Sequence, residues 1–63
     1  MKDYWTVWGR ARAWDELSRQ DSYDTLEVAK EMAEELFSYH GWFEVLVRDS
    51  KGNEVAKHKR GKP

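Results

Sequence analysis

The residues that could carry out covalent chemistry are few in this 63-residue chain. It has no Cys, and no Ser has the neighbours of a nucleophile elbow, so the sequence shows no activated nucleophile. Its two imidazoles, His40 and His58, combine with no carboxylates at the spacing of a closed tetrahedral metal site. We interpret His40 as a helix-terminal residue, because the carbonyl end of a helix favours a cation. We therefore predict a protein that is not an enzyme and that has no cofactor and no metal site.

A row of aromatic and cationic residues is the main candidate for a binding site. Between residues 4 and 14 the side chains alternate, with small and apolar residues on one parity and aromatic or Arg residues on the other. Trp, Tyr and Arg dominate binding hot spots, and four Trp exceed what one small core needs. With two residues of a later strand, the predicted partner-binding set is Tyr4, Trp8, Arg10, Arg12, Trp14, Leu46 and Arg48.

The same row has a purely structural alternative. Trp8 and Trp14 could pack on Leu46, on Trp42 and on the Arg stems, which would seal the surface as a second small core with cation–π contacts. Reasoning from the residues leaves both interpretations open.

Two further charged groups are visible. Four carboxylates of the expected helix could meet a basic partner, although such a row is more often a solvated face: Glu27, Glu31, Glu34 and Glu35. Cations crowd the carboxyl end, and we expect residues 59–63 to form a basic flexible tail after a single domain at 1–58. The cations of this region are Lys57, Lys59, Arg60 and Lys62.

The elements that must position these residues follow from periodicity. Apolar residues at helical spacing predict a helix from about Thr25 to Tyr39, with Asp24 as N-cap in a capping box, Tyr23 stapled to Val28, and Gly41 as the left-handed stop. Alternation predicts strands within 4–14 and 43–48, a weaker edge strand within 16–22, and a last strand at 54–57 after a turn at 49–53.

These elements predict an α+β fold of the ββαββ type. One helix packs on one face of an antiparallel sheet with strand order 2-1-3-4, or on three strands if the polar second strand does not pair. The other face is left uncovered, and it carries the aromatic and Arg row.

Composition narrows the class of protein. Charge is nearly balanced, with 11 basic and 12 acidic residues, which argues against a broad duplex-binding footprint. The first five residues contain no signal-peptide segment, no run of residues approaches membrane-spanning length, and the lack of Cys favours a reducing, intracellular setting. We therefore expect neither secretion nor a membrane partner.

Two partial resemblances bear on function. The plan of elements, with Tyr-Asp-Thr-Leu-Glu at 23–27 and Phe-Glu-Val-Leu-Val-Arg-Asp at 43–49, resembles small accessory proteins of tailed bacteriophages, some of which inhibit host enzymes. That resemblance implies a cytoplasmic location in a bacterial host. The tripeptide Trp8-Gly9-Arg10 with Trp42 is similar to the signature of the WGR domain, a DNA-end-binding module, but Ala11 and Arg12 replace glycines of that signature. We interpret the second match as accidental.

Three functions are therefore expected in order. The first is a protein-interaction module, of phage accessory or inhibitor type, that binds through the aromatic and Arg row. The second is weak nucleic-acid binding by the same row and the basic carboxyl end, which salt would weaken. The third is a structural role in which the domain pairs with itself, so the protein is a monomer or a homodimer.

Overall fold

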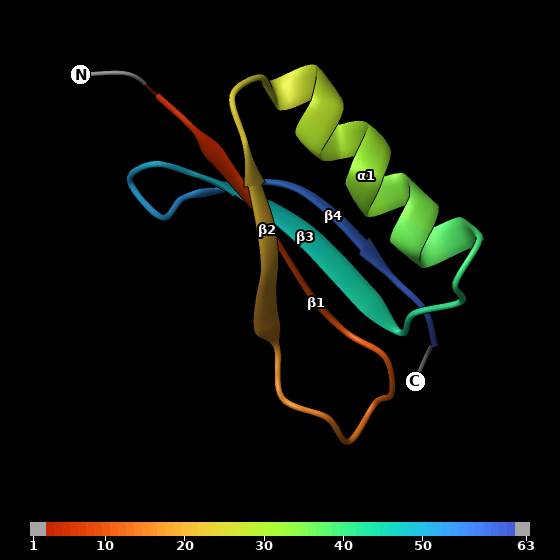
Figure 1. Cartoon of the computed structure of the whole chain (residues 1–63). Helices are drawn as coiled ribbons and strands as arrows, with labels where there is room; N and C mark the ends of the chain where they lie inside the picture. The colour runs from red at the N-terminus through yellow and green to blue at the C-terminus, as the bar shows by residue number, and fades with distance from the viewer. Residues whose placement is uncertain (1–2, 62–63) are drawn as a thin grey trace.

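A computed structural model describes residues 3–61, which form a four-stranded sheet crossed on one face by a single helix (Figure 1). The elements in chain order are β1 (Trp5–Arg10), β2 (Ser18–Tyr23), α1 (Leu26–Ser38), β3 (Glu44–Asp49) and β4 (Glu54–Lys59). The strands lie in the order β2-β1-β3-β4, and each neighbouring pair is antiparallel. The predicted α+β class, the ββαββ sequence of elements and the four-strand order 2-1-3-4 are confirmed.

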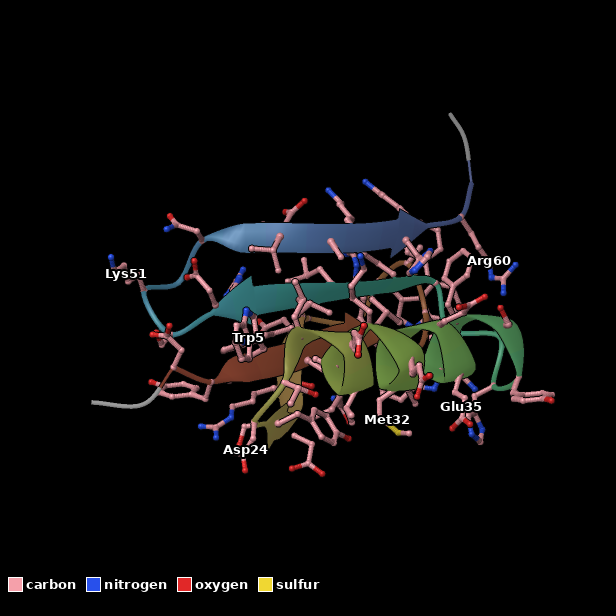
Figure 2. All side chains as sticks on the ribbon, turned by 90° about the horizontal axis from the view of Figure 1, so that it is seen from above. Trp5, Asp24, Met32, Glu35, Lys51 and Arg60 are labelled. Atoms are coloured by element: carbon pink, nitrogen blue, oxygen red, sulfur yellow. The ribbon has the colours of Figure 1, made fainter. Side chains whose placement is uncertain are left out.

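The main core lies between α1 and the two central strands. Val7 of β1 pairs with Val47 of β3, and both side chains point at the helix together with Val45. They meet Ala29 and Ala33, whose small side chains let the helix approach the sheet closely. Partly buried side chains surround this centre, including Trp5, which Figure 2 shows between the helix and the sheet: Trp5, Tyr23, Leu26, Met32, Leu36, Phe37, Trp42 and Ala56.

Gly9 of β1 has a packing role on the helix side of the sheet. A Cβ at this position would lie 2.8 Å from Cε3 of Trp42 and 3.1 Å from the carbonyl oxygen of Glu44. The Trp42 ring therefore occupies the space that a side chain would take, and the strand can accept it only because Gly9 has none.

The helix begins one residue later than the predicted capping box. Thr25 has extended backbone angles and its Oγ1 accepts the Val28 N–H at 3.3 Å, so Thr25 and not Asp24 is the N-cap. Both residue types cap well, and the sequence alone does not rank two adjacent candidates. The predicted staple fails for the same reason, because the shift of register leaves Val28 40% exposed while Tyr23 packs against the core.

The helix stop agrees with the prediction. Gly41 has a φ of 67°, in the left-handed region. The amides of Tyr39 and Trp42 bond back to the carbonyl groups of Glu35 and Leu36, at 2.8 and 3.2 Å. The chain then turns directly into β3.

Strand β1 is shorter than the alternation predicts. The alternating pattern runs to Trp14, but the strand ends at Arg10 and residues 11–17 form a loop. Arg12 and Asp15 close a turn within this loop, since the Asp15 amide bonds to the Arg12 carbonyl at 3.0 Å and the Asp15 carboxylate accepts the Arg12 amide at 3.2 Å. Local turn bonds thus replace the ladder that an extended chain would need.

The carboxyl end is held further than the predicted boundary at residue 58. β4 continues to Lys59, which pairs with Glu44. The Arg60 amide then donates to the Phe43 carbonyl at 2.8 Å, and its guanidinium donates to the carbonyls of Trp42 and Phe37 at the end of α1 (Figure 2). Lys62, which we placed in the basic tail, lies outside the described residues.

No helix within residues 3–61 is long and apolar enough to cross a bilayer.

Candidate functional site

The sheet face opposite α1 is not covered by any element among residues 3–61 (Figure 1). Register places Thr6 beside Arg48 and Trp8 beside Leu46 on this face, so the two strands bring together residues that were predicted to meet. Arg19 of β2 lies opposite Trp8 on one side, and Lys57 of β4 lies opposite Leu46 on the other. We call this surface the open face, and its residues are Thr6, Trp8, Arg10, Arg19, Glu44, Leu46, Arg48, Lys57 and Lys59.

The centre of the open face is a small second core. The guanidinium carbon of Arg48 lies 4.6 Å from the centre of the Trp8 ring, and Leu46 is only 3% exposed. The Trp8 indole N–H donates to Oγ1 of Thr6 at 2.8 Å. The structural interpretation therefore holds for Trp8, Leu46 and Arg48, although each was also a candidate for binding.

Arg10 is committed to the fold. Its Nε and Nη2 both lie 2.8 Å from Oε1 of Glu44, and its Nη1 donates to the carbonyls of Ala13 and Asp15 in the loop. Lys57 approaches Oε2 of Glu44 at 3.5 Å, so the buried carboxylate has two cationic partners, as burial of a charge requires. Arg10 is thus a structural residue that fixes the 11–17 loop.

The other predicted residues lie apart from this centre. Trp14 is 79% exposed on the 11–17 loop, and the Arg12 guanidinium carbon lies 5.8 Å from its ring centre. Tyr4 is 46% exposed just before β1. The six residues of β1 span about 20 Å at the usual rise per strand residue. Tyr4 and Trp14 therefore mark opposite ends of the open face, and the structure does not gather the predicted row into one patch. Trp42, which the structural alternative placed on this surface, packs on the helix side at Gly9.

A groove lies at the Tyr4 end of the open face. Its volume is about 220 Å³. Arg19 and Arg48 contribute guanidinium groups that have no carboxylate within 4.0 Å among residues 3–61. The remaining lining residues are Tyr4, Thr6, Trp8, Asp49, Ser50 and Gly52.

Asp49 belongs to this groove, but its carboxylate serves the β3–β4 turn. Oδ1 accepts the amides of Lys51 and Asn53, each at 2.9 Å. The backbone hydrogen bond from Asn53, followed by that from Lys51, lowers the pKa of Asp49 from its ordinary value. The turn therefore uses the carboxylate oxygens that could otherwise pair with the groove cations.

Sequence reasoning did not identify Arg19 as a candidate. The β1–β2 pairing slips between Val7 and Trp8, so Val7 faces Asp21 while Trp8 faces Arg19, and Gln20 is the extra residue. The position of this irregularity decides whether Arg19 joins the open face. Nothing in the polar β2 sequence marks it.

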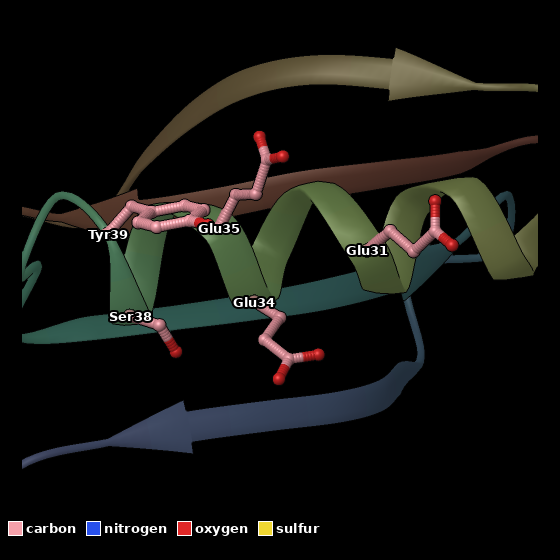
Figure 3. A pocket seen from close by; sticks show the side chains of 5 residues that line it. All are labelled: Glu31, Glu34, Glu35, Ser38 and Tyr39. Atoms are coloured by element: carbon pink, nitrogen blue, oxygen red, sulfur yellow. The ribbon is translucent and has the colours of Figure 1, made fainter.

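The opposite side of the molecule is acidic. Figure 3 shows the carboxylates of α1 around a hollow on the solvent side of the helix, with a volume of about 470 Å³, lined by Glu31, Glu34, Glu35, Ser38 and Tyr39. The balanced net charge therefore conceals a separation, with carboxylates on the helix side and cations on the open face.

Neither His joins a constellation typical of catalysis. The His58 ring stacks on Phe37 with centres 5.1 Å apart, and His40 is exposed after the helix. No group of three potential metal ligands occurs in the part of the chain that the structure describes.

Comparisons with protein-family models, with curated proteins and with solved structures found no match to this chain. Function has to be argued from the site alone.

Proposed function

We propose that this domain is a non-enzymatic binding module that docks a protein partner on its open face. The observation that carries the proposal is the separation of charge across the fold. The open face presents Arg19, Arg48 and Lys59 without carboxylate partners within 4.0 Å among residues 3–61, while carboxylates gather on the helix side. Such a surface favours a partner whose own surface is acidic.

The state of the aromatic rings supports a protein rather than a nucleic acid. Base stacking needs a free ring face, and the Arg48 guanidinium already covers Trp8 while the Arg12 guanidinium lies over Trp14. Two further cations, Arg10 and Lys57, are paired with Glu44. The open face therefore offers guanidinium groups and aromatic edges, which are common in protein interfaces.

The phage resemblance, taken with this surface, makes a host enzyme the expected partner and inhibition the expected outcome. The docking proposal itself does not depend on that resemblance, because it follows from the charge and exposure of the open face.

The test compares two surface variants. Arg19→Glu/Lys59→Glu reverses two exposed cations of the open face, and Glu31→Lys/Glu34→Lys reverses two carboxylates of the helix side as a matched control. Each protein is immobilised, exposed to an extract of its source cells, and the retained proteins are quantified by mass spectrometry. Circular dichroism first establishes that both variants keep the fold.

We expect one set of proteins to be retained by the unmodified chain and by the helix control, and to be lost with the open-face variant. Loss with the helix variant alone would contradict the proposal. Retention that disappears on nuclease treatment would favour nucleic acid instead. Sedimentation at micromolar concentration checks the self-association alternative, for which a dimer that dissociates in the open-face variant is the signature.

A further inference from the structure

The groove at the Tyr4 end of the open face contains two guanidinium groups whose donors are unused. Neither the Arg19 nor the Arg48 side chain makes a hydrogen bond or an ion pair with another of residues 3–61. Arg10 in contrast uses its Nε, Nη1 and Nη2 within the fold. The two groove arginines therefore differ from the arginine that the fold consumes.

Arg48 is also held in position. Its guanidinium stacks on Trp8 at 4.6 Å, and the indole N–H is tied to Thr6 at 2.8 Å. Stacking restrains the plane of a guanidinium and leaves its N–H groups directed outward at the rim, so less side-chain entropy is lost when it binds. Arg19, on the opposite strand, approaches the same ring from the other side of the groove.

The size and chemistry of the groove select its occupant. A volume of about 220 Å³ is below the roughly 300 Å³ at which pockets for drug-sized ligands begin, and it has room for one or two side chains. A planar fork of N–H donors matches a carboxylate, which accepts two parallel hydrogen bonds. The one carboxylate in the lining, Asp49, is occupied by the amides of the turn.

We infer that this groove is a subsite for a carboxylate side chain, an Asp or Glu of the partner protein, held between Arg19 and Arg48 beside the Trp8 ring. The inference rests on the proposed function, since it names the feature of the partner that the open face recognises. Tyr4 and Ser50 close the groove at its outer end and supply hydroxyl groups to the rim.

The experiment uses the full chain and two capped pentapeptides, one of five Glu and one of five Gln. Binding is followed by two-dimensional ¹H–¹⁵N NMR, in which the Trp8 indole N–H and the amides of residues 48–52 report on the groove. Arg19→Gln and Arg48→Gln each remove one guanidinium, and Arg12→Gln is the matched control, because Arg12 is an arginine on the 11–17 loop outside the groove lining. Arg48→Lys tests whether the fork matters beyond the charge.

We expect saturable shifts at the groove with the Glu peptide and none with the Gln peptide. The dissociation constant should rise about tenfold in Arg19→Gln and in Arg48→Gln, as for the loss of one charge-assisted hydrogen bond, and stay unchanged in Arg12→Gln. Arg48→Lys should restore only part of the affinity.

Equal shifts with both peptides, equal weakening by Arg12→Gln, or tighter binding of a thymidine pentanucleotide than of the Glu peptide would each overturn the inference. The proposed function fails separately, when exchange of charge on the open face leaves retention of every protein unchanged. If the groove takes no carboxylate but Arg19→Glu/Lys59→Glu still loses the partner, the subsite is rejected and the docking face stands.

Discussion

Gly9 keeps its place in β1 because the Trp42 ring fills the space of a side chain. A Cβ at this position would lie 2.8 Å from Cε3 of Trp42, closer than real contacts allow. Gly9→Ala should therefore destabilise the protein by about 1–3 kcal/mol, the usual cost of overpacking a core. Urea unfolding measures this cost. Ala13→Gly in the exposed loop is the control for a one-carbon change, and it should cost much less.

The partner of that clash can be identified by a double-mutant cycle. Trp42→Leu is destabilising by itself, but in the Gly9→Ala background it should cost less, because the added methyl then meets a smaller side chain. Strict additivity of the two changes would contradict the assignment of the strain to the Trp42 ring.

Asp49 makes the stability of the β3–β4 turn depend on acid pH. Hydrogen bonds from the Asn53 and Lys51 amides lower the pKa of Asp49 in the folded state below its value in the unfolded chain. Its contribution to stability is therefore present above the unfolded pKa, ordinarily near 3.8, and is lost as the pH falls through the lower folded value.

The change that tests this linkage is Asp49→Asn, which keeps an oxygen acceptor but cannot titrate. Between pH 6 and pH 2 the unmodified protein should lose more stability than Asp49→Asn, as measured by urea unfolding at each pH. Asp24→Asn, at an exposed position before the helix, should follow the unmodified protein. A pH profile of Asp49→Asn identical to that of the unmodified chain would contradict the role of the carboxylate.

At the residue scale, identities predicted location better than they predicted use. Parity alone placed Trp8, Leu46 and Arg48 on one face, and the register of β1 with β3 confirms it. That Arg10 is consumed by Glu44 could not be predicted, because the two residues meet only through pairing between strands distant in the chain. Each residue of the tripeptide at 8–10 has an intramolecular role: Trp8 under Arg48, Gly9 under Trp42, and Arg10 on Glu44.

At the scale of elements, the start of α1 distinguishes two candidate caps. Thr25→Ala removes the side chain that accepts the Val28 amide and should cost about 0.5–2 kcal/mol, the range for loss of an N-cap. Asp24→Ala, one residue earlier, should cost only a few tenths of that range through the helix dipole. Thermal unfolding by circular dichroism gives both values. A larger loss in Asp24→Ala would restore the capping box predicted from the sequence.

The elements themselves were largely predictable, and their limits were not. A helical stripe and strict alternation are strong periodic signals, so the helix and the strands are found where periodicity puts them. The end of β1 was missed because Arg12 and Trp14 continue the alternation inside a loop that hydrogen bonds to Asp15 and Arg10 hold. The extent of β4 was missed because a run of cations resembles a tail, while pairing with β3 extends the strand to Lys59.

At the scale of the whole molecule, Arg60 joins the last strand to the helix. Its guanidinium lies 4.2 Å from the Phe37 ring centre and donates to the carbonyls of Phe37 and Trp42. The last turn of α1 has no basic residue of its own, so Arg60 supplies the cation that the carbonyl end favours.

Removal of this cation should loosen the end of the fold that holds it. Arg60→Met keeps the apolar stem but loses the donors, and should lower global stability by about 1 kcal/mol. Hydrogen exchange of the amides at 36–42 should become faster than in the unmodified protein. Lys59→Met, an exposed neighbour with no such contacts, is the control. Unchanged exchange in Arg60→Met would show that β4 pairing alone holds this end.

The central position of β1 also bears on how the chain folds. The pairs β1–β2 and β3–β4 join neighbours in sequence, whereas β1 and β3 meet only after β2 and α1 have been traversed. Closing that long loop costs more chain entropy than forming either hairpin, and its reward comes late. The ladder of Val7 with Val47 is therefore the expected rate-limiting contact, and the two hairpins are expected to exist as fluctuating, separately formed halves before it closes.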